Sequence, residues 1–266
     1  MSHDDAAAGA GPVDGQRARH DRTVTSAIAE AIVLAAGNGD RFSGGTGTSK
    51  LVEPVRGVPL IARTLDAAWR AGIARADVVL GYRATEVREA IERHAPAGLG
   101  LRFVHNPHWH EENGLSVLAA GRREPGRRFA LLMGDHLFAP ALLRRLLLAP
   151  AGSEAVLLGV DTRPAPPEVA AEATRVRLRE GRVVAIAKGL VPYDALDTGL
   201  FVCTPALFDA IEESCRAGDT TLTGGVRRLA AHDLVRGIDI GDELWWDVDT
   251  PADLRVAEAL LETTPA

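Results

Sequence analysis

The chain has 266 residues, of which 46% are hydrophobic and 25% are charged, as in ordinary soluble globular proteins. Its net charge of −6 argues against binding nucleic acid through the phosphates. No apolar run approaches the roughly 18 residues needed to cross a bilayer, and Cys203 and Cys215 are too few for a disulfide framework. We therefore expect a cytoplasmic protein that has no membrane segment and does not bind nucleic acid.

Residues 1–25 consist of alanine, glycine and charged side chains, without apolar periodicity. They lack the apolar core of a signal peptide and are predicted to form a disordered tail. Residues 26–266 are predicted to form a single domain.

In the first half of the domain, short apolar runs alternate with amphipathic segments. Strands are predicted at 31–35, 77–80, 101–105 and 129–133, and helices at 60–71, 85–94, 115–122 and 140–148. This alternation is typical of a mostly parallel sheet covered on both faces, a three-layer Rossmann-like α/β fold. Asp77 is expected to lie on a solvent-exposed face.

After Pro150 the pattern changes to shorter, alternating strands. Strands are predicted at 155–160, 196–202 and 244–248, with a hairpin of 175–179 and 182–187 around Glu180-Gly181. A final helix is predicted from Pro251, with Thr250 as its cap and Asp253 in its first turn.

A glycine-rich loop follows the first strand and extends to Lys50. It does not match a dinucleotide fingerprint, which would need glycine in place of Phe42 and would indicate a dehydrogenase. It does not match a P-loop either, because Ser49 and Leu51 stand where glycine and Ser or Thr are required. Its small residues could still bring backbone amides close to a phosphate, with Arg41 and Lys50 neutralising the charge. The candidate nucleotide-binding residues are Leu34, Ala35, Ala36, Gly37, Asn38 and Gly39.

Lys50 and Lys188 are the only lysines among 30 basic residues, the rest being arginine. A lysine retained against such a bias is a candidate for a task that needs a compact point charge, although chance could also have left two.

Candidate metal ligands follow two of the predicted strands. Asp135 comes directly after the strand at 129–133, at the sheet edge where ligands bind in open α/β folds, and a carboxylate there suits Mg²⁺. Asp247 and Asp249, two residues apart, would share one face of an extended segment, and such a pair of like charges needs a cation. The alternatives are that Asp135 caps a helix and that Asp249 only orders the start of the last helix.

The motif L-A-A-G-x-G-x-R followed by Lys50, together with the runs 188–190, 197–202 and 243–253, resembles the nucleotidyltransferases that act on sugar phosphates and phospho-alcohols. Within them the sequence is most similar to the CTP:inositol-1-phosphate cytidylyltransferases, over roughly residues 28–262. The resemblance implies transfer of CMP from CTP to a small phosphorylated alcohol, with release of pyrophosphate and with Mg²⁺ as cofactor.

The resemblance also implies roles for single residues. Arg41 and Lys50 would contact the triphosphate, and Asp135, Asp247 and Asp249 would hold Mg²⁺. A small β subdomain at about 150–245 would bind the acceptor, its phosphate on Lys188 and its hydroxyls near Asp197, with Trp245 as core or cavity wall. A homodimer is a further expectation.

The segment 105–116 contains three histidines and two glutamates, which invites a zinc interpretation, but its spacing and Pro107 offer no clear ligand geometry. We expect instead that Asn113 caps a helix whose N-terminus faces the nucleotide. The resemblance implies that Gly114 and Ser116 contact the base.

Alternatives remain for both substrate and class. The acceptor could be a phosphonate, another cyclitol phosphate or phosphocholine, although a choline site would need an aromatic cage. The protein could also be an inactive nucleotide-binding regulatory subunit, but the joint presence of Lys50, Asp135, Asp247 and Asp249 favours an enzyme.

Overall fold

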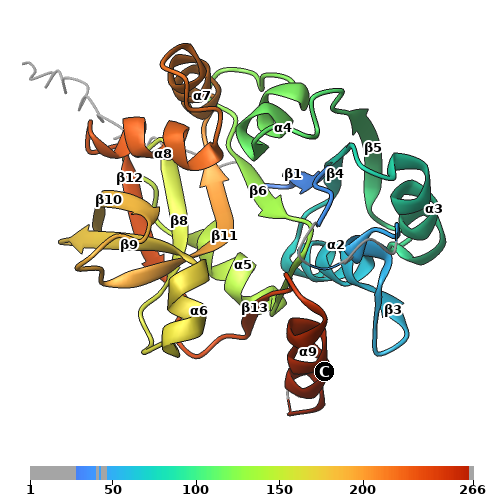
Figure 1. The fold of residues 1–266 in the computed structure, drawn as a ribbon. Coiled ribbons are helices and arrows are strands. Elements are labelled where there is room, and N and C mark those ends of the chain that lie inside the picture. Colours follow the sequence, from blue (N-terminus) through green and yellow to red (C-terminus); the bar gives the residue numbers. More distant parts are fainter. Residues whose placement is uncertain (1–27, 40–41, 43–46, 264–266) are drawn as a thin grey trace, which may run out of the picture.

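A mixed sheet runs through the molecule, with helices on both of its faces (Figure 1). The computed structural model describes residues 28–39, 42 and 47–263. Within these residues the main sheet has nine strands in the order β5-β4-β1-β6-β11-β8-β12-β10-β9. Their bounds are β1 Glu30–Ala35, β4 Arg75–Leu80, β5 Gly100–His105, β6 Phe129–Met133, β8 Val156–Asp161, β9 Thr174–Arg179, β10 Arg182–Lys188, β11 Ala195–Cys203 and β12 Val235–Asp239.

The first four strands in this order are parallel, as predicted. In β1 and β6, Leu34 pairs with Met133, so both strands end at the same edge of the sheet. The amide of Gly134 donates a hydrogen bond to the Leu34 carbonyl at 2.8 Å, which keeps the C-terminal ends of β1 and β6 together. The glycine-rich loop and Asp135 therefore leave the sheet side by side.

The other part of the sheet is mostly antiparallel. Strand β11 lies antiparallel between β6 and β8, and β9 pairs with β10 in a hairpin. Glu180 and Gly181 both have positive φ, 52° and 77°, as a two-residue hairpin turn requires. The predicted hairpin is confirmed, whereas β12, which joins β8 in parallel, was not predicted.

The helices form an outer layer on each face of the sheet, which confirms the three-layer α/β prediction. Along β1, Val33 belongs to one buried cluster and Ile32 to the other, because successive side chains of a strand point to opposite faces. Helices α2 (Leu60–Ala71), α3 (Ala84–His94) and α5 (Pro140–Leu148) cover the first face, and α4 (Asn113–Ala119), α7 (Ala206–Arg216) and α8 (Leu222–Ala230) cover the second. None of the helices in the described residues is both long and apolar enough to cross a membrane.

Short elements complete the edge of the sheet near Asp135. Strands β7 (His136–Phe138) and β13 (Trp245–Asp247) form a separate antiparallel pair, in which Asp247 lies opposite His136. The remaining short elements are η1 (Lys50–Val52), β2 (Pro54–Val55), β3 (Val58–Pro59) and α6 (Pro167–Glu172).

The final helix, α9 (Pro251–Thr263), begins as predicted. Asp253 Oδ2 accepts hydrogen bonds from the amide and hydroxyl of Thr250, at 2.8 and 2.7 Å, and the Asp253 amide donates back to the Thr250 hydroxyl. This is a capping box that reciprocally satisfies donors at the helix start.

The expectation that Asp77 faces solvent is wrong. Its side chain is only 18% exposed and accepts two hydrogen bonds from Arg102, at 2.8 and 2.6 Å, with Arg123 on the same carboxylate. Burial alone would raise the pKa of Asp77, but the hydrogen bonds from Arg102 and the charge of Arg123 outweigh it, and the pKa is lowered. Asp77 thus ties β4 to β5 and to the segment after α4.

We expect Asp77→Asn to lower the free energy of unfolding by about 1–3 kcal/mol at pH 7, because two arginines lose their charged acceptor. A carboxyl whose pKa is lowered on folding stabilises the fold above its unfolded pKa, near 4, and this contribution disappears as pH falls through the lower folded pKa. Urea unfolding at pH 7 and pH 3 measures the effect. The exposed Asp66, paired with Arg70 within one helix, serves as control, since Asp66→Asn should change little. An equal loss for Asp77→Asn at both pH values would contradict the assignment.

Candidate active site

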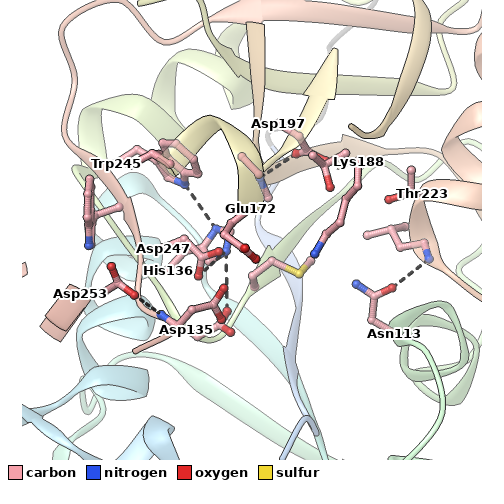
Figure 2. Close-up of a pocket in the computed structure, with 18 of the residues that line it drawn as sticks. Asn113, Asp135, His136, Glu172, Lys188, Asp197, Thr223, Trp245, Asp247 and Asp253 are labelled. Atoms are coloured by element: carbon pink, nitrogen blue, oxygen red, sulfur yellow. Dashed lines mark hydrogen bonds and ion pairs between the residues drawn. The ribbon is translucent and has the colours of Figure 1, made fainter. Parts of the chain in front are cut away.

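A cavity of about 450 Å³ lies at the sheet edge where β6 ends. Its lining comes from both parts of the main sheet, including β6, β10 and β11, from the separate pair β7 and β13, and from α4, α6 and α8 (Figure 2). Seven residues predicted from sequence line it, namely Asn113, Asp135, Lys188, Asp197, Trp245, Asp247 and Asp249. Folding thus brings together side chains from segments more than 130 residues apart.

Lys50 lies between two of the predicted metal-binding carboxylates. Its Nζ is 2.7 Å from Asp135 Oδ2 and 2.8 Å from Asp249 Oδ1, and the residue is 8% exposed. Burial would lower the pKa of Lys50, but the charges of Asp135 and Asp249 outweigh burial and raise the pKa above its usual value. The ammonium therefore stays charged, and Lys50 in turn holds the pKa of Asp135 below its usual range despite burial. The sequence analysis predicted that Lys50 would contact a triphosphate, and it did not predict the pairing of Lys50 with these carboxylates.

The glycine-rich loop contributes to the position of Lys50. A Cβ on Gly39, which has a φ of +62°, would lie 3.1 Å from the Lys50 Cγ, so the loop packs closely on the lysine stem. Leu34, Ala35 and Ala36 are buried, so only their backbone could face a nucleotide. Arg41 lies outside the described residues.

His136 is the site residue that the sequence analysis missed, although it directly follows Asp135. It is 8% exposed, its Nδ1 is 2.8 Å from the Thr198 carbonyl, and its Nε2 is 3.3 Å from Asp247 Oδ1 and 3.8 Å from Asp135 Oδ1. Burial opposes the charged form, but the charges of Asp247 and Asp135 raise the pKa of His136 to about 9. Asp247 and Asp249 are therefore neutralised by different cations, His136 and Lys50.

The two residues predicted to bind the acceptor, Lys188 at the end of β10 and Asp197 in β11, both line the cavity (Figure 2). Burial raises the pKa of Asp197 to about 6, while its Oδ1 accepts a hydrogen bond from the Gly199 amide at 2.8 Å. Glu172, at the end of α6, also lines the cavity and was not singled out from the sequence, because its surroundings there carry no motif. Trp245 is both a buried core residue and part of the cavity wall.

The donors present fit a divalent cation. Asp135, His136 and Asp247 each offer a ligand atom, in the case of His136 only through a deprotonated ring nitrogen, and these atoms lie within 4.8 Å of one another. Asp247 Oδ1 is buried, and no described residue gives it a well-aligned hydrogen bond, so a cation could satisfy it. This group contains His136 in the place of Asp249 of the predicted set, and Asp249 contacts Lys50 instead. The group is also the only such group found in the part of the chain that the structure describes, so the histidines of 105–110 form none there.

The three residues of this segment predicted to bind the nucleotide, Asn113, Gly114 and Ser116, all make contacts within the protein. The prediction that Asn113 caps the helix is wrong, because Glu112 holds the cap position and α4 runs from 113 to 119 instead of 115 to 122. The Oδ1 of Asn113 accepts a hydrogen bond from the Leu222 amide at 2.9 Å. A Cβ on Gly114 would lie 2.4 Å from the Thr220 carbonyl oxygen, so α4 packs closely on the turn before α8. Ser116 is buried and accepts a hydrogen bond from Asn106. Of the three, only Asn113 reaches the cavity lining.

The mixed sheet, its two helix layers and the site at the sheet edge together make a mixed α/β fold of the nucleotidyltransferase type. Residues 31–223 match the model of the MobA-like NTP transferase domain, and the chain belongs to this family, which confirms the resemblance seen in the sequence.

Individual relatives refine this assignment. The chain is 39% identical to the "Bifunctional IPC transferase and DIPP synthase" of Rubrobacter xylanophilus, over 91% of this chain and 54% of that protein. It is 32% identical to the "CMP-5'-(3-aminopropyl)phosphonate synthase" of Streptomyces rubellomurinus, over 86% of this chain and 38% of that protein. The solved inositol-1-phosphate CTP transferase from T. maritima superposes with a TM-score of 0.76 at 25% identity, covering 90% of this chain and 99% of that one. The chain thus spans about half, or less, of the length of these two sequence relatives.

Proposed function

We propose that this protein transfers CMP from CTP to a small phosphorylated alcohol of the inositol 1-phosphate type and releases pyrophosphate. The observation that carries the proposal is that one cavity is lined both by the carboxylates Asp135, Asp247 and Asp249 and by Lys188 and Asp197. The first group suits a metal-bound nucleotide triphosphate, and the second suits an anionic, hydroxylated acceptor. The names of the Rubrobacter and T. maritima relatives support the same reaction.

In this reaction a phosphate oxygen of the acceptor attacks the α-phosphorus of CTP. A new P–O bond forms, the bond to the β-phosphate oxygen breaks, and pyrophosphate leaves with the electron pair. The attacking oxygen is already anionic near pH 7, so no general base is needed. Catalysis then consists of positioning and charge neutralisation.

Different residues would bind the acceptor and the metal-bound nucleotide. Lys188 would attract the acceptor phosphate and reduce its repulsion from the nucleotide, while Asp197 would accept hydrogen bonds from acceptor hydroxyls. Lys50 would move from its carboxylate partners toward the triphosphate. Asp135 with Asp247 or Asp249 would hold Mg²⁺, which when bound would neutralise negative charge on the α-phosphate.

A second candidate acceptor is an aminoalkylphosphonate, and the Streptomyces relative is the specific observation that favours it. A phosphonate offers the same anionic oxygens to Lys188. An amino group would pair with a carboxylate such as Asp197 instead of donating a hydroxyl hydrogen bond.

A pyrophosphate-release assay tests the proposal by crossing the four NTPs with inositol 1-phosphate, other cyclitol phosphates, aminoalkylphosphonates and phosphocholine in Mg²⁺. We expect turnover with CTP and inositol 1-phosphate. Nucleotide binding without pyrophosphate release from any pair would instead identify an inactive regulatory subunit.

We expect Lys188→Met to raise the acceptor KM about tenfold or more and to leave the CTP KM almost unchanged, because one charge-assisted contact to the acceptor is lost. Arg177, exposed on the neighbouring strand β9, provides the control, since Arg177→Met removes a cation outside the cavity lining. Equal effects of Lys188→Met on the acceptor and CTP KM values would argue against this assignment.

A further inference from the structure

His136 connects the two ends of the cavity through the two edges of its ring. Nδ1 is 2.8 Å from the carbonyl of Thr198 on β11, and Nε2 is 3.3 Å from Asp247 Oδ1 on β13. Thr198 directly follows Asp197, the candidate acceptor residue, and Asp247 belongs to the group that fits a cation. The ring thus lies between the Thr198 carbonyl on one side and the Asp247 carboxylate on the other. Figure 2 shows His136 beside Asp247.

The Thr198 contact fixes the orientation of the ring. A carbonyl oxygen only accepts hydrogen bonds, so Nδ1 carries a proton and Nε2 faces the carboxylates. The indole Nε1–H of Trp245 also points at this edge of the ring, at 3.3 Å from Nδ1, a longer contact than the 2.8 Å to the Thr198 carbonyl.

Strand β11 is shaped to receive this ring. Gly199 has a φ of +69°, and a Cβ there would lie 2.4 Å from His136 Cε1, so no other residue leaves room for the imidazole. The pairing of β11 with β8 is irregular between Asp197 and Phe201, at the same place. Such irregularities bend a strand locally and are common beside functional sites.

The irregular segment is held from both sides. The hydroxyl of Thr198, a fully buried residue, donates to the Gly159 carbonyl on β8 at 2.8 Å, while the carbonyl of Thr198 accepts from His136. The Asp197 carboxylate accepts from the Gly199 amide. His136 therefore provides the link between this segment and β13.

We propose that His136 is a positioning residue that sets the separation between the acceptor-binding segment at Asp197 and the cation-binding carboxylate of Asp247. The proposal deepens the proposed function and rests on it. One ring edge acts on acceptor binding through Thr198, and the other acts on cation binding through Asp247. The two effects should be separable, because each contact uses a different nitrogen.

Two substitutions of His136 each keep one of its two contacts and remove the other. In His136→Asn the amide nitrogen can take the place of Nδ1, so the Thr198 contact is kept and the Asp247 contact is lost. In His136→Gln the longer side chain can bring its amide nitrogen to the place of Nε2, so the Asp247 contact is kept and the Thr198 contact is lost. A purely structural role would make both variants alike.

The experiment measures acceptor KM, kcat and melting temperature, and also Mn²⁺ affinity without nucleotide by electron paramagnetic resonance. We expect His136→Gln to raise the acceptor KM about tenfold while Mn²⁺ affinity stays within about threefold of wild type. We expect His136→Asn to weaken Mn²⁺ binding about tenfold and to lower kcat, with acceptor KM within about threefold. His94→Gln is the matched control, because the Nδ1 of His94 also contacts a carbonyl oxygen, on α3 and outside the cavity lining. Acceptor KM, kcat and Mn²⁺ affinity should all remain at wild-type values in this variant.

Changes of equal size in acceptor KM and Mn²⁺ affinity for both variants, in proportion to their melting temperatures, would overturn the proposal. If wild-type protein turns over no acceptor, the proposed function fails, and the Mn²⁺ titration still decides this inference. Weaker binding in His136→Asn than in His136→Gln would then support it, and equal binding would overturn it.

Discussion

Asp135→Asn should reduce kcat at least 100-fold, because a carboxylate that holds the catalytic cation supplies several kcal/mol of transition-state stabilisation. Asp135 is the one carboxylate that contacts Lys50 and also belongs to the group that fits a cation. Asparagine keeps the shape of the side chain and one oxygen but removes its charge. The measurement is steady-state pyrophosphate release, together with Mn²⁺ affinity, which should fall as well.

Asp161→Asn is the matched control for this experiment. Asp161 also lies at the end of a sheet strand, is 8% exposed and accepts two hydrogen bonds from the side chain of Arg163, but it is not part of the cavity lining. We expect it to lose stability while retaining kcat within about threefold, since it removes a charged pair outside the site. Full activity in Asp135→Asn, or equal loss in both variants, would contradict the metal assignment.

Lys50→Met should have two opposite effects. The rate should fall about 100-fold, because the triphosphate and the departing pyrophosphate lose a cation. Mn²⁺ binding without nucleotide should become about tenfold tighter, because Asp135 and Asp249 lose the ammonium that competes with the cation for them. The interaction of two charges 4 Å apart is worth on the order of 1–4 kcal/mol between water and a protein surface, which is enough for this change. Methionine retains most of the stem that packs against Gly39.

Lys188→Met is the control for the Mn²⁺ affinity of Lys50→Met. Lys188→Met should weaken acceptor binding, as stated above, and leave Mn²⁺ affinity unchanged, because the lysine that pairs with Asp135 and Asp249 is Lys50. Weaker Mn²⁺ binding in Lys50→Met would mean that Lys50 organises the carboxylates instead of competing for them.

Several features of this protein were predictable because they depend on neighbours in sequence. The buried strands, the amphipathic helices, the hairpin at Glu180-Gly181 and the capping box of Thr250 and Asp253 all follow from local periodicity and local hydrogen bonding. The place of Asp135 at the sheet edge follows from its position directly after a parallel strand. Local sequence also signals the alternation of elements that makes the fold class.

The partners of the site residues depend on how distant segments pack, and the tertiary structure decided them. Lys50 pairs with Asp249 across 199 positions of the chain, and His136 joins Thr198 to Asp247. The partly buried ion pairs of Asp77 and the contact between Asn113 and the first residue of α8 arise in the same way. A carboxylate or an amide looks the same in sequence whether it meets water, a ligand or a buried cation, because the burial and charge that distinguish these cases come from elements brought together only on folding.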